Sequence, residues 1–133
     1  MPTDDKLVDA ALAVRRHALA PYSHFLVGAA LETAEGEIFT GCNVENATYG
    51  LTICAERVAI FKALSEGRRQ FTRIAVAADT DTLTPPCGAC RQILWEFCGD
   101  IPVLLANLHG KREWLQMKDL FPRAFDRSFL KDK

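Results

Sequence analysis

The chain has 133 residues, of which 49% are hydrophobic and 25% are charged, and its formal net charge is −1 at pH 7. This length and composition are ordinary for a globular protein that buries its own core, so a metal is not needed to replace a missing core. The near-neutral charge disfavours a nucleic-acid partner, because proteins that follow a phosphate backbone usually carry a basic face or stripe.

The N-terminal segment is polar and acidic, and no long apolar run follows it. We therefore expect neither a secretory signal nor a membrane span. The five cysteines, an odd number, favour metal binding or catalysis in a reducing compartment over disulfides, so the expected location is cytoplasmic. Because the chain shows no repeat, low-complexity tract or linker, we expect residues 1–133 to form one domain.

The first half of the chain predicts a helix followed by a β-hairpin. Apolar residues at helical spacing favour a helix over residues 4–19, which Pro21 stops. Strands are expected at 25–32 and 37–42, joined by a turn at 34–36.

The second half alternates helices and strands. We expect helices that begin near residues 53 and 88, strands at 74–78, 103–106 and 114–115, and a helical turn at 118–121. Together these elements predict an α/β fold, a three-layer sandwich in which a mixed five-stranded sheet carries helices on both faces.

Two short segments indicate a metal site, Cys54-Ala55-Glu56 and Pro86-Cys87-Gly88-Ala89-Cys90. Three thiolates would hold a zinc ion and leave one tetrahedral position for water, which is typical of a catalytic site. Glu56 lies two residues after a ligand, close enough to transfer protons without binding the metal. Both segments fall where a helix is expected to begin. The helix N-termini, with Arg57 and Arg91, are candidates to offset the negative charge of the three sulfurs.

The cysteine motif has other readings. Cys87 and Cys90 alone also fit a redox pair, or half of a structural four-cysteine zinc site. Cys98 lies too far along the same helix to be a fourth ligand, whereas spacing does not exclude Cys42. The three histidines stand in no ligand-like pairing.

Five blocks of the sequence, in order, resemble the small, free-nucleoside cytidine deaminases along nearly the whole chain. The second cysteine segment itself follows the pattern described for zinc-dependent nucleobase deaminases. The matching blocks are Ala20-Pro21-Tyr22-Ser23 with Phe25-Leu26-Val27-Gly28-Ala29-Ala30, Gly41-Cys42-Asn43-Val44-Glu45-Asn46-Ala47, Cys54-Ala55-Glu56-Arg57, and Pro86-Cys87-Gly88-Ala89-Cys90-Arg91-Gln92.

The resemblance implies hydrolysis of cytidine and 2′-deoxycytidine to uridine and 2′-deoxyuridine with release of ammonia, in pyrimidine salvage. It implies one zinc ion per subunit, with the ligands Cys54, Cys87 and Cys90. Glu56 would protonate the ring at N3, Asn43 and Glu45 would hold the ribose 3′-hydroxyl, Phe25 would pack against the base, and the backbone at Ala55 would contact its amide edge. From the residues alone, Phe25 is more simply a core aromatic, and Asn43 and Glu45 are turn residues.

The resemblance also implies a homotetramer with active sites at subunit interfaces. Phe125 matches an aromatic position that reaches a neighbour's site, although Arg123 replaces a residue that is often small in relatives. Three alternatives remain: a deaminase of another aminopyrimidine, a non-catalytic zinc module that serves as an interaction scaffold, and an enzyme that edits RNA or DNA.

Overall fold

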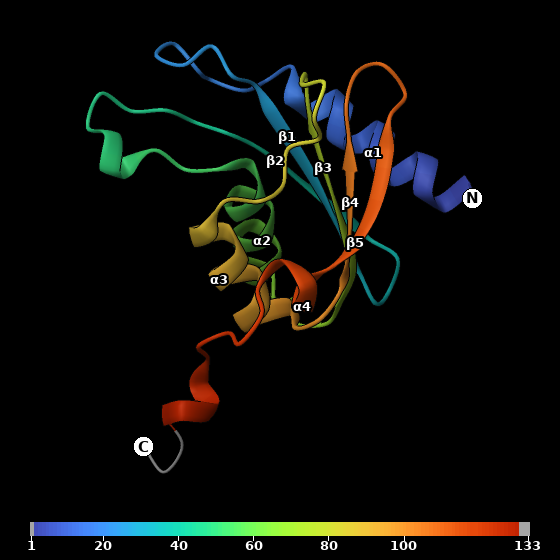
Figure 1. The fold of residues 1–133 in the computed structure, drawn as a ribbon, viewed down its shortest axis with the longest axis vertical. Helices are drawn as coiled ribbons and strands as arrows, with labels where there is room; N and C mark the ends of the chain where they lie inside the picture. Colours follow the sequence, from blue (N-terminus) through green and yellow to red (C-terminus); the bar gives the residue numbers. More distant parts are fainter. Residues whose placement is uncertain (1, 131–133) are drawn as a thin grey trace.

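A computed structural model describes residues 2–130 of the chain (Figure 1). Its strands are β1 (Val27–Thr33), β2 (Ile38–Cys42), β3 (Phe71–Ala78), β4 (Pro102–Ala106) and β5 (Arg112–Gln116). Its helices are α1 (Pro2–Arg15), α2 (Ala55–Ser65), α3 (Gly88–Cys98) and the single turn α4 (Met117–Leu120), with 3₁₀ turns at Tyr49–Leu51 and Arg127–Leu130. In this part of the chain the longest helix has 14 residues, and none is long and apolar enough to cross a membrane.

The strands form one sheet in the order β2-β1-β3-β4-β5. The pair β3 and β4 is parallel, and the other three pairs are antiparallel. The predicted mixed five-stranded sheet is therefore confirmed. Because β3 and β4 are parallel, the chain must cross over between them, and α3 is part of that crossover.

Helices cover both faces of the sheet, which confirms the predicted sandwich (Figure 1). Alternate residues of the central strands face opposite layers, as the pleat of a strand requires. Ala75 and Ala77 of β3 pack with α1, whereas Ile74 and Val76 belong to the core shared with α2 and α3. The small side chains on one face let α1 approach closely, and the larger ones on the other fill the core beneath the cysteines.

Gly41 lets the start of α2 lie directly on the edge strand β2. A Cβ atom at this position would come within 2.5 Å of both the Ala55 carbonyl oxygen and the Ala59 nitrogen. Backbone atoms of a packed helix do not yield to such a contact, so only glycine permits this approach. It fixes the height at which Cys54 and Glu56 stand above the sheet.

The first helix ends at Arg15, four residues before the expected end at Leu19. The segment after it pairs with the loop that follows β2: the Leu19 N–H donates to the Asn43 carbonyl, and the Glu45 N–H donates to the Leu19 carbonyl. This tertiary pairing competes with helix continuation and wins before Pro21 is reached. The strand expected at 74–78 also begins earlier, at Phe71, because Phe71 pairs with Thr33 beyond an irregularity in the register.

Candidate active site

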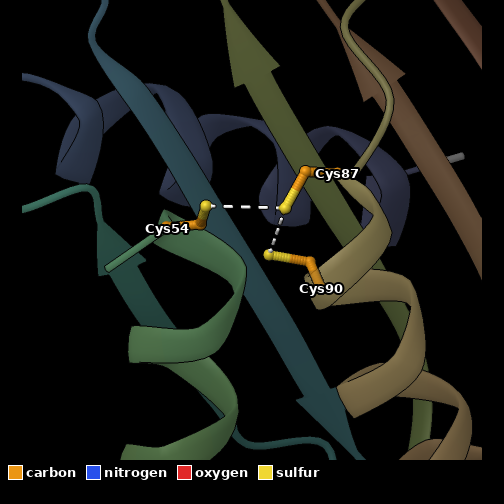
Figure 2. A group of neighbouring side chains, drawn as sticks. All are labelled: Cys54, Cys87 and Cys90. Atoms are coloured by element: carbon orange, nitrogen blue, oxygen red, sulfur yellow. Dashed lines mark hydrogen bonds between the residues drawn. The ribbon is translucent and has the colours of Figure 1, made fainter. Parts of the chain in front are cut away.

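The three predicted sulfur ligands meet where α2 and α3 begin (Figure 2). Cys54 and Cys87 are the N-cap residues of these helices, and Cys90 lies in the first turn of α3. The Sγ atoms of Cys54 and Cys87 are 3.7 Å apart, those of Cys87 and Cys90 are 3.5 Å apart, and all three lie within 4.8 Å of one another. Sulfurs that share one tetrahedral zinc at about 2.3 Å would lie about 3.8 Å apart, so this donor set fits zinc.

No fourth protein ligand joins the group within residues 2–130. Cys42 lies in β2 outside the cluster, and Cys98 ends α3. Glu56 is not a member either, so its carboxylate stays off the ligand positions. The reading as a structural four-cysteine site therefore lacks its fourth ligand, and the three sulfurs leave one tetrahedral position open.

The two arginines predicted near the sulfurs behave differently. Arg57 donates from Nη2 to the Cys54 Sγ at 3.5 Å, and this bond raises the pKa of Arg57. Among the described residues Arg91 makes no hydrogen bond to a sulfur: it donates to the Pro86 and Leu120 carbonyls, both at 2.7 Å. Arg91 therefore does not bond a thiol as Arg57 does. Its guanidinium satisfies the carbonyl of the loop residue Pro86 and that of Leu120, the last residue of α4. These two hydrogen bonds connect the cysteine loop to α4.

The environment separates the acidities of the thiols. The hydrogen bond from Cys90 lowers the pKa of Cys54 to about 5, with help from Arg57 and Cys87. The same pairing, together with burial, raises the pKa of Cys90. These neighbours therefore favour the ionised form of Cys54, which is the form in which a cysteine binds a metal.

Glu56 lies in the first turn of α2, and its side chain is almost fully enclosed, with a residue exposure of 4%. Burial raises the pKa of its carboxyl to about 7. An acid with a pKa near the working pH can both take up and release a proton, which suits a general acid/base.

Seven of the predicted site residues line one cavity of about 220 Å³. These residues are Phe25, Asn43, Glu45, Cys54, Ala55, Glu56 and Cys87. The volume lies below the ~300–1,000 Å³ that is typical of pockets for drug-sized ligands, which favours a small substrate. Residues that form separate motifs in the sequence thus meet around one space.

Asn43 is buried and connects the cavity wall to β1. Its Oδ1 accepts a hydrogen bond of 2.9 Å from the Val27 N–H, and its Nδ2 donates to the Phe25 carbonyl at 2.7 Å. An amide has two donors and two acceptor positions, so one of each remains for a ligand. The description of Asn43 as only a turn residue is incomplete, because its side chain also holds the Phe25 backbone in place.

Phe125 is outside the cavity of its own chain. Its side chain is 56% exposed and stacks on Phe129, with the ring centroids 5.6 Å apart. The segment after α4 projects from the body of the molecule (Figure 1). It is held to α3 by hydrogen bonds from Gln92 to the Phe125 carbonyl and from Trp95 to Asp126, each 2.9 Å long.

Sequence reasoning missed several residues of the site. Ser23, Thr52 and Thr84 also line the cavity. Ser23 belongs to the first matching block, but its side chain had no predicted role. Its partner Glu45 is 22 residues away, and no periodic pattern signals such a contact.

An open metal position beside a buried proton-transfer group, on an α/β sandwich, defines the class of zinc-binding hydrolytic domains rather than that of structural zinc modules. Residues 1–105 match the family model described as the cytidine and deoxycytidylate deaminase zinc-binding region. The chain is 50% identical over 127 residues to a cytidine deaminase of Halalkalibacterium halodurans, a match that covers 95% of this chain and 96% of that one.

Two solved structures support the same family. A cytidine deaminase from Burkholderia pseudomallei superimposes with a TM-score of 0.88 at 49% identity, covering 91% of this chain and 98% of that chain. A cytidine deaminase from Mycobacterium tuberculosis gives a TM-score of 0.77 at 36% identity, covering 91% and 95%. The chain therefore belongs to the cytidine and deoxycytidylate deaminase family, which confirms the resemblance seen in the sequence.

Proposed function

We propose that the protein hydrolyses cytidine and 2′-deoxycytidine to uridine and 2′-deoxyuridine with release of ammonia. The observation that carries the proposal is that three thiol sulfurs and the buried Glu56 meet at one cavity that also holds Asn43 and Glu45. Relatives that match nearly the whole chain are named cytidine deaminases, which supports the same substrate.

Cys54, Cys87 and Cys90 would hold one zinc ion. When bound, zinc supplies a Lewis acid that brings the pKa of a bound water to about 7. The chain contributes the compensation: two helix N-termini point at the sulfurs, and the Arg57 guanidinium adds a positive charge beside Cys54.

Glu56 is assigned the proton transfers. It takes one proton of the water that adds to C4 of the base and delivers it to ring N3. It then carries the proton of the new C4 hydroxyl to the C4 amino group, so that the C4–N bond breaks, the C4 carbonyl forms and ammonia leaves. Its pKa of about 7 suits both directions. Enclosure of the carboxyl also keeps bulk water from competing for the same protons.

The remaining cavity residues are assigned to the substrate. Phe25 packs against the base, and the Ala55 backbone contacts its amide edge. Asn43 and Glu45 hold the sugar 3′-hydroxyl through an amide and a carboxylate. A carboxylate here would repel a phosphate, so a nucleoside suits this pocket better than a nucleotide.

The oligomeric state and the cellular location of the protein are also part of the proposal. We infer a homotetramer with active sites at subunit interfaces, supported by the exposed Phe125 on a segment that projects from the body. Each subunit would be one catalytic domain over residues 1–133, acting in cytoplasmic pyrimidine salvage without a nucleic-acid or membrane partner. Sedimentation of the purified protein at four times the mass of the chain tests the assembly.

The loss of ultraviolet absorbance on adding the zinc-loaded protein to cytidine tests the reaction. We expect turnover of cytidine and 2′-deoxycytidine, and none of the 5′-monophosphate. Absence of any absorbance change with either nucleoside, at one zinc per chain, would overturn the proposal.

A further inference from the structure

Ser23 lies in the exposed turn before β1, at the rim of the cavity. We propose that Ser23 is a positioning residue that aims the Glu45 carboxylate at the sugar of the substrate, an inference that rests on the proposed function. The turn formed by residues 21–24 would then recognise the sugar indirectly, through the carboxylate that it holds.

Within the part of the chain that the structure describes, the hydrogen bonds to the Glu45 carboxylate come from this turn. Its Oε1 accepts hydrogen bonds from the Tyr22 N–H at 3.0 Å and the Ser23 N–H at 3.1 Å, and its Oε2 accepts one from the Ser23 hydroxyl. An ionised carboxylate has about four acceptor positions. Three are occupied, so one remains for a hydroxyl donor of the ligand, and its direction is set by the other three.

The Ser23 hydroxyl also links Glu45 to Phe25. Its oxygen accepts a hydrogen bond of 3.1 Å from the Phe25 N–H while its proton goes to Glu45. His24, between them, has φ 58°, in the left-handed region that residues with a side chain seldom adopt. Hydrogen bonds to residues distant in the sequence stabilise this unfavourable backbone conformation. The Phe25 N–H thus orients the Ser23 hydroxyl so that its proton is directed at Glu45.

Direct binding of the substrate by Ser23 fits the geometry less well. A serine hydroxyl has one donor, and Glu45 takes it. Ser23 therefore acts through Glu45, and the bond also lowers the pKa of Glu45, which keeps that carboxyl ionised.

The test compares S23A with the wild type on cytidine and on 2′,3′-dideoxycytidine, which lacks the 3′-hydroxyl. We expect kcat/KM for cytidine to fall about fivefold, through KM rather than kcat, because a charge-assisted contact loses its orientation. For the dideoxynucleoside, the change is expected to stay within about twofold. S23T keeps the hydroxyl and should restore the KM for cytidine.

Two further variants complete the design. S65A removes a serine hydroxyl that donates to the Lys62 carbonyl on the exposed end of α2, and it should leave kcat/KM for both substrates unchanged. S23C keeps the size of the side chain with a weakly donating thiol, and it should reproduce the selective loss if S23A does not fold.

The possible results separate the two proposals. Equal losses for both nucleosides, no loss, or an S23T variant as impaired as S23A would overturn the role of Ser23 and leave cytidine deamination standing. A wild-type protein that turns over neither nucleoside would overturn the proposed function and this inference together.

Discussion

One end of the cavity rests on two helix starts, whereas the other rests on two loops that hydrogen-bond to each other. The metal end comprises Cys54, Glu56, Cys87 and Cys90, and the loop end comprises Ser23, Phe25, Asn43 and Glu45. Helices packed on a sheet fix their first residues firmly, while loops owe their shape to particular polar bonds. Packing therefore positions the residues that carry out the chemistry, and hydrogen bonds position the residues that recognise the substrate. Substitutions at the two ends should therefore fail in different ways.

The largest effect is expected from breaking the metal end outright. C87S replaces one of three thiolates by a poor zinc ligand, so zinc content should fall from one per chain to nearly none, and deamination should become undetectable. Elemental analysis of the purified variant measures the first effect, and the absorbance assay measures the second. C42A is the matched control, because Cys42 lies outside the cluster. Zinc loss in C42A, or full zinc in C87S, would contradict the ligand assignment.

Glu56 separates proton transfer from metal binding at the same end. E56Q keeps the shape of the side chain and removes its acid/base function, so kcat should fall by about 10²–10⁴ while zinc content is unchanged. Single-turnover assays and metal analysis on one preparation provide both values. An E56Q variant with wild-type kcat would show that another group transfers the protons.

Arg57 tests how the charge of the sulfur cluster is offset. R57Q removes the guanidinium 3.5 Å from the Cys54 Sγ, and zinc affinity should fall about 10–100-fold, as is typical for groups that support metal ligands. Competition with a chelating dye measures the affinity. R69Q is the control, because Arg69 is exposed and donates to the backbone carbonyls of Leu64 and Arg68. Equal affinities in R57Q and the wild type would leave the compensation to the helix N-termini alone.

The metal end was largely predictable from the residues themselves, whereas Phe25, Asn43 and Glu45 at the loop end were named only through the family resemblance and Ser23 was missed. The cysteine spacing, with Pro86 before it, located the start of α3, and the separation of Cys54 and Glu56 implied a carboxyl near the metal. These signals are local. Contacts between segments more than 20 residues apart determine where α1 ends and hold the hydrogen bond from Ser23 to Glu45. The bond from Arg91 to the Leu120 carbonyl could not be predicted for the same reason, since Leu120 is 29 residues away.

The smallest effect is expected from Asn43 at the loop end, and it should appear in the free energy of unfolding as well as in activity. N43A removes the amide that accepts from the Val27 N–H and donates to the Phe25 carbonyl. A buried N–H left without a partner costs about 1–3 kcal/mol, so the free energy of unfolding should fall by that amount, and KM should rise as Phe25 loses its support. Urea denaturation of the zinc-loaded protein measures the stability. N46A is the control: Asn46 is exposed, and its side chain accepts a hydrogen bond from the nearby Thr48 N–H, so its change should stay within about 0.5 kcal/mol. If N43A raised KM without any loss of stability, Asn43 would serve the ligand alone, and the loop end would be as firmly packed as the metal end.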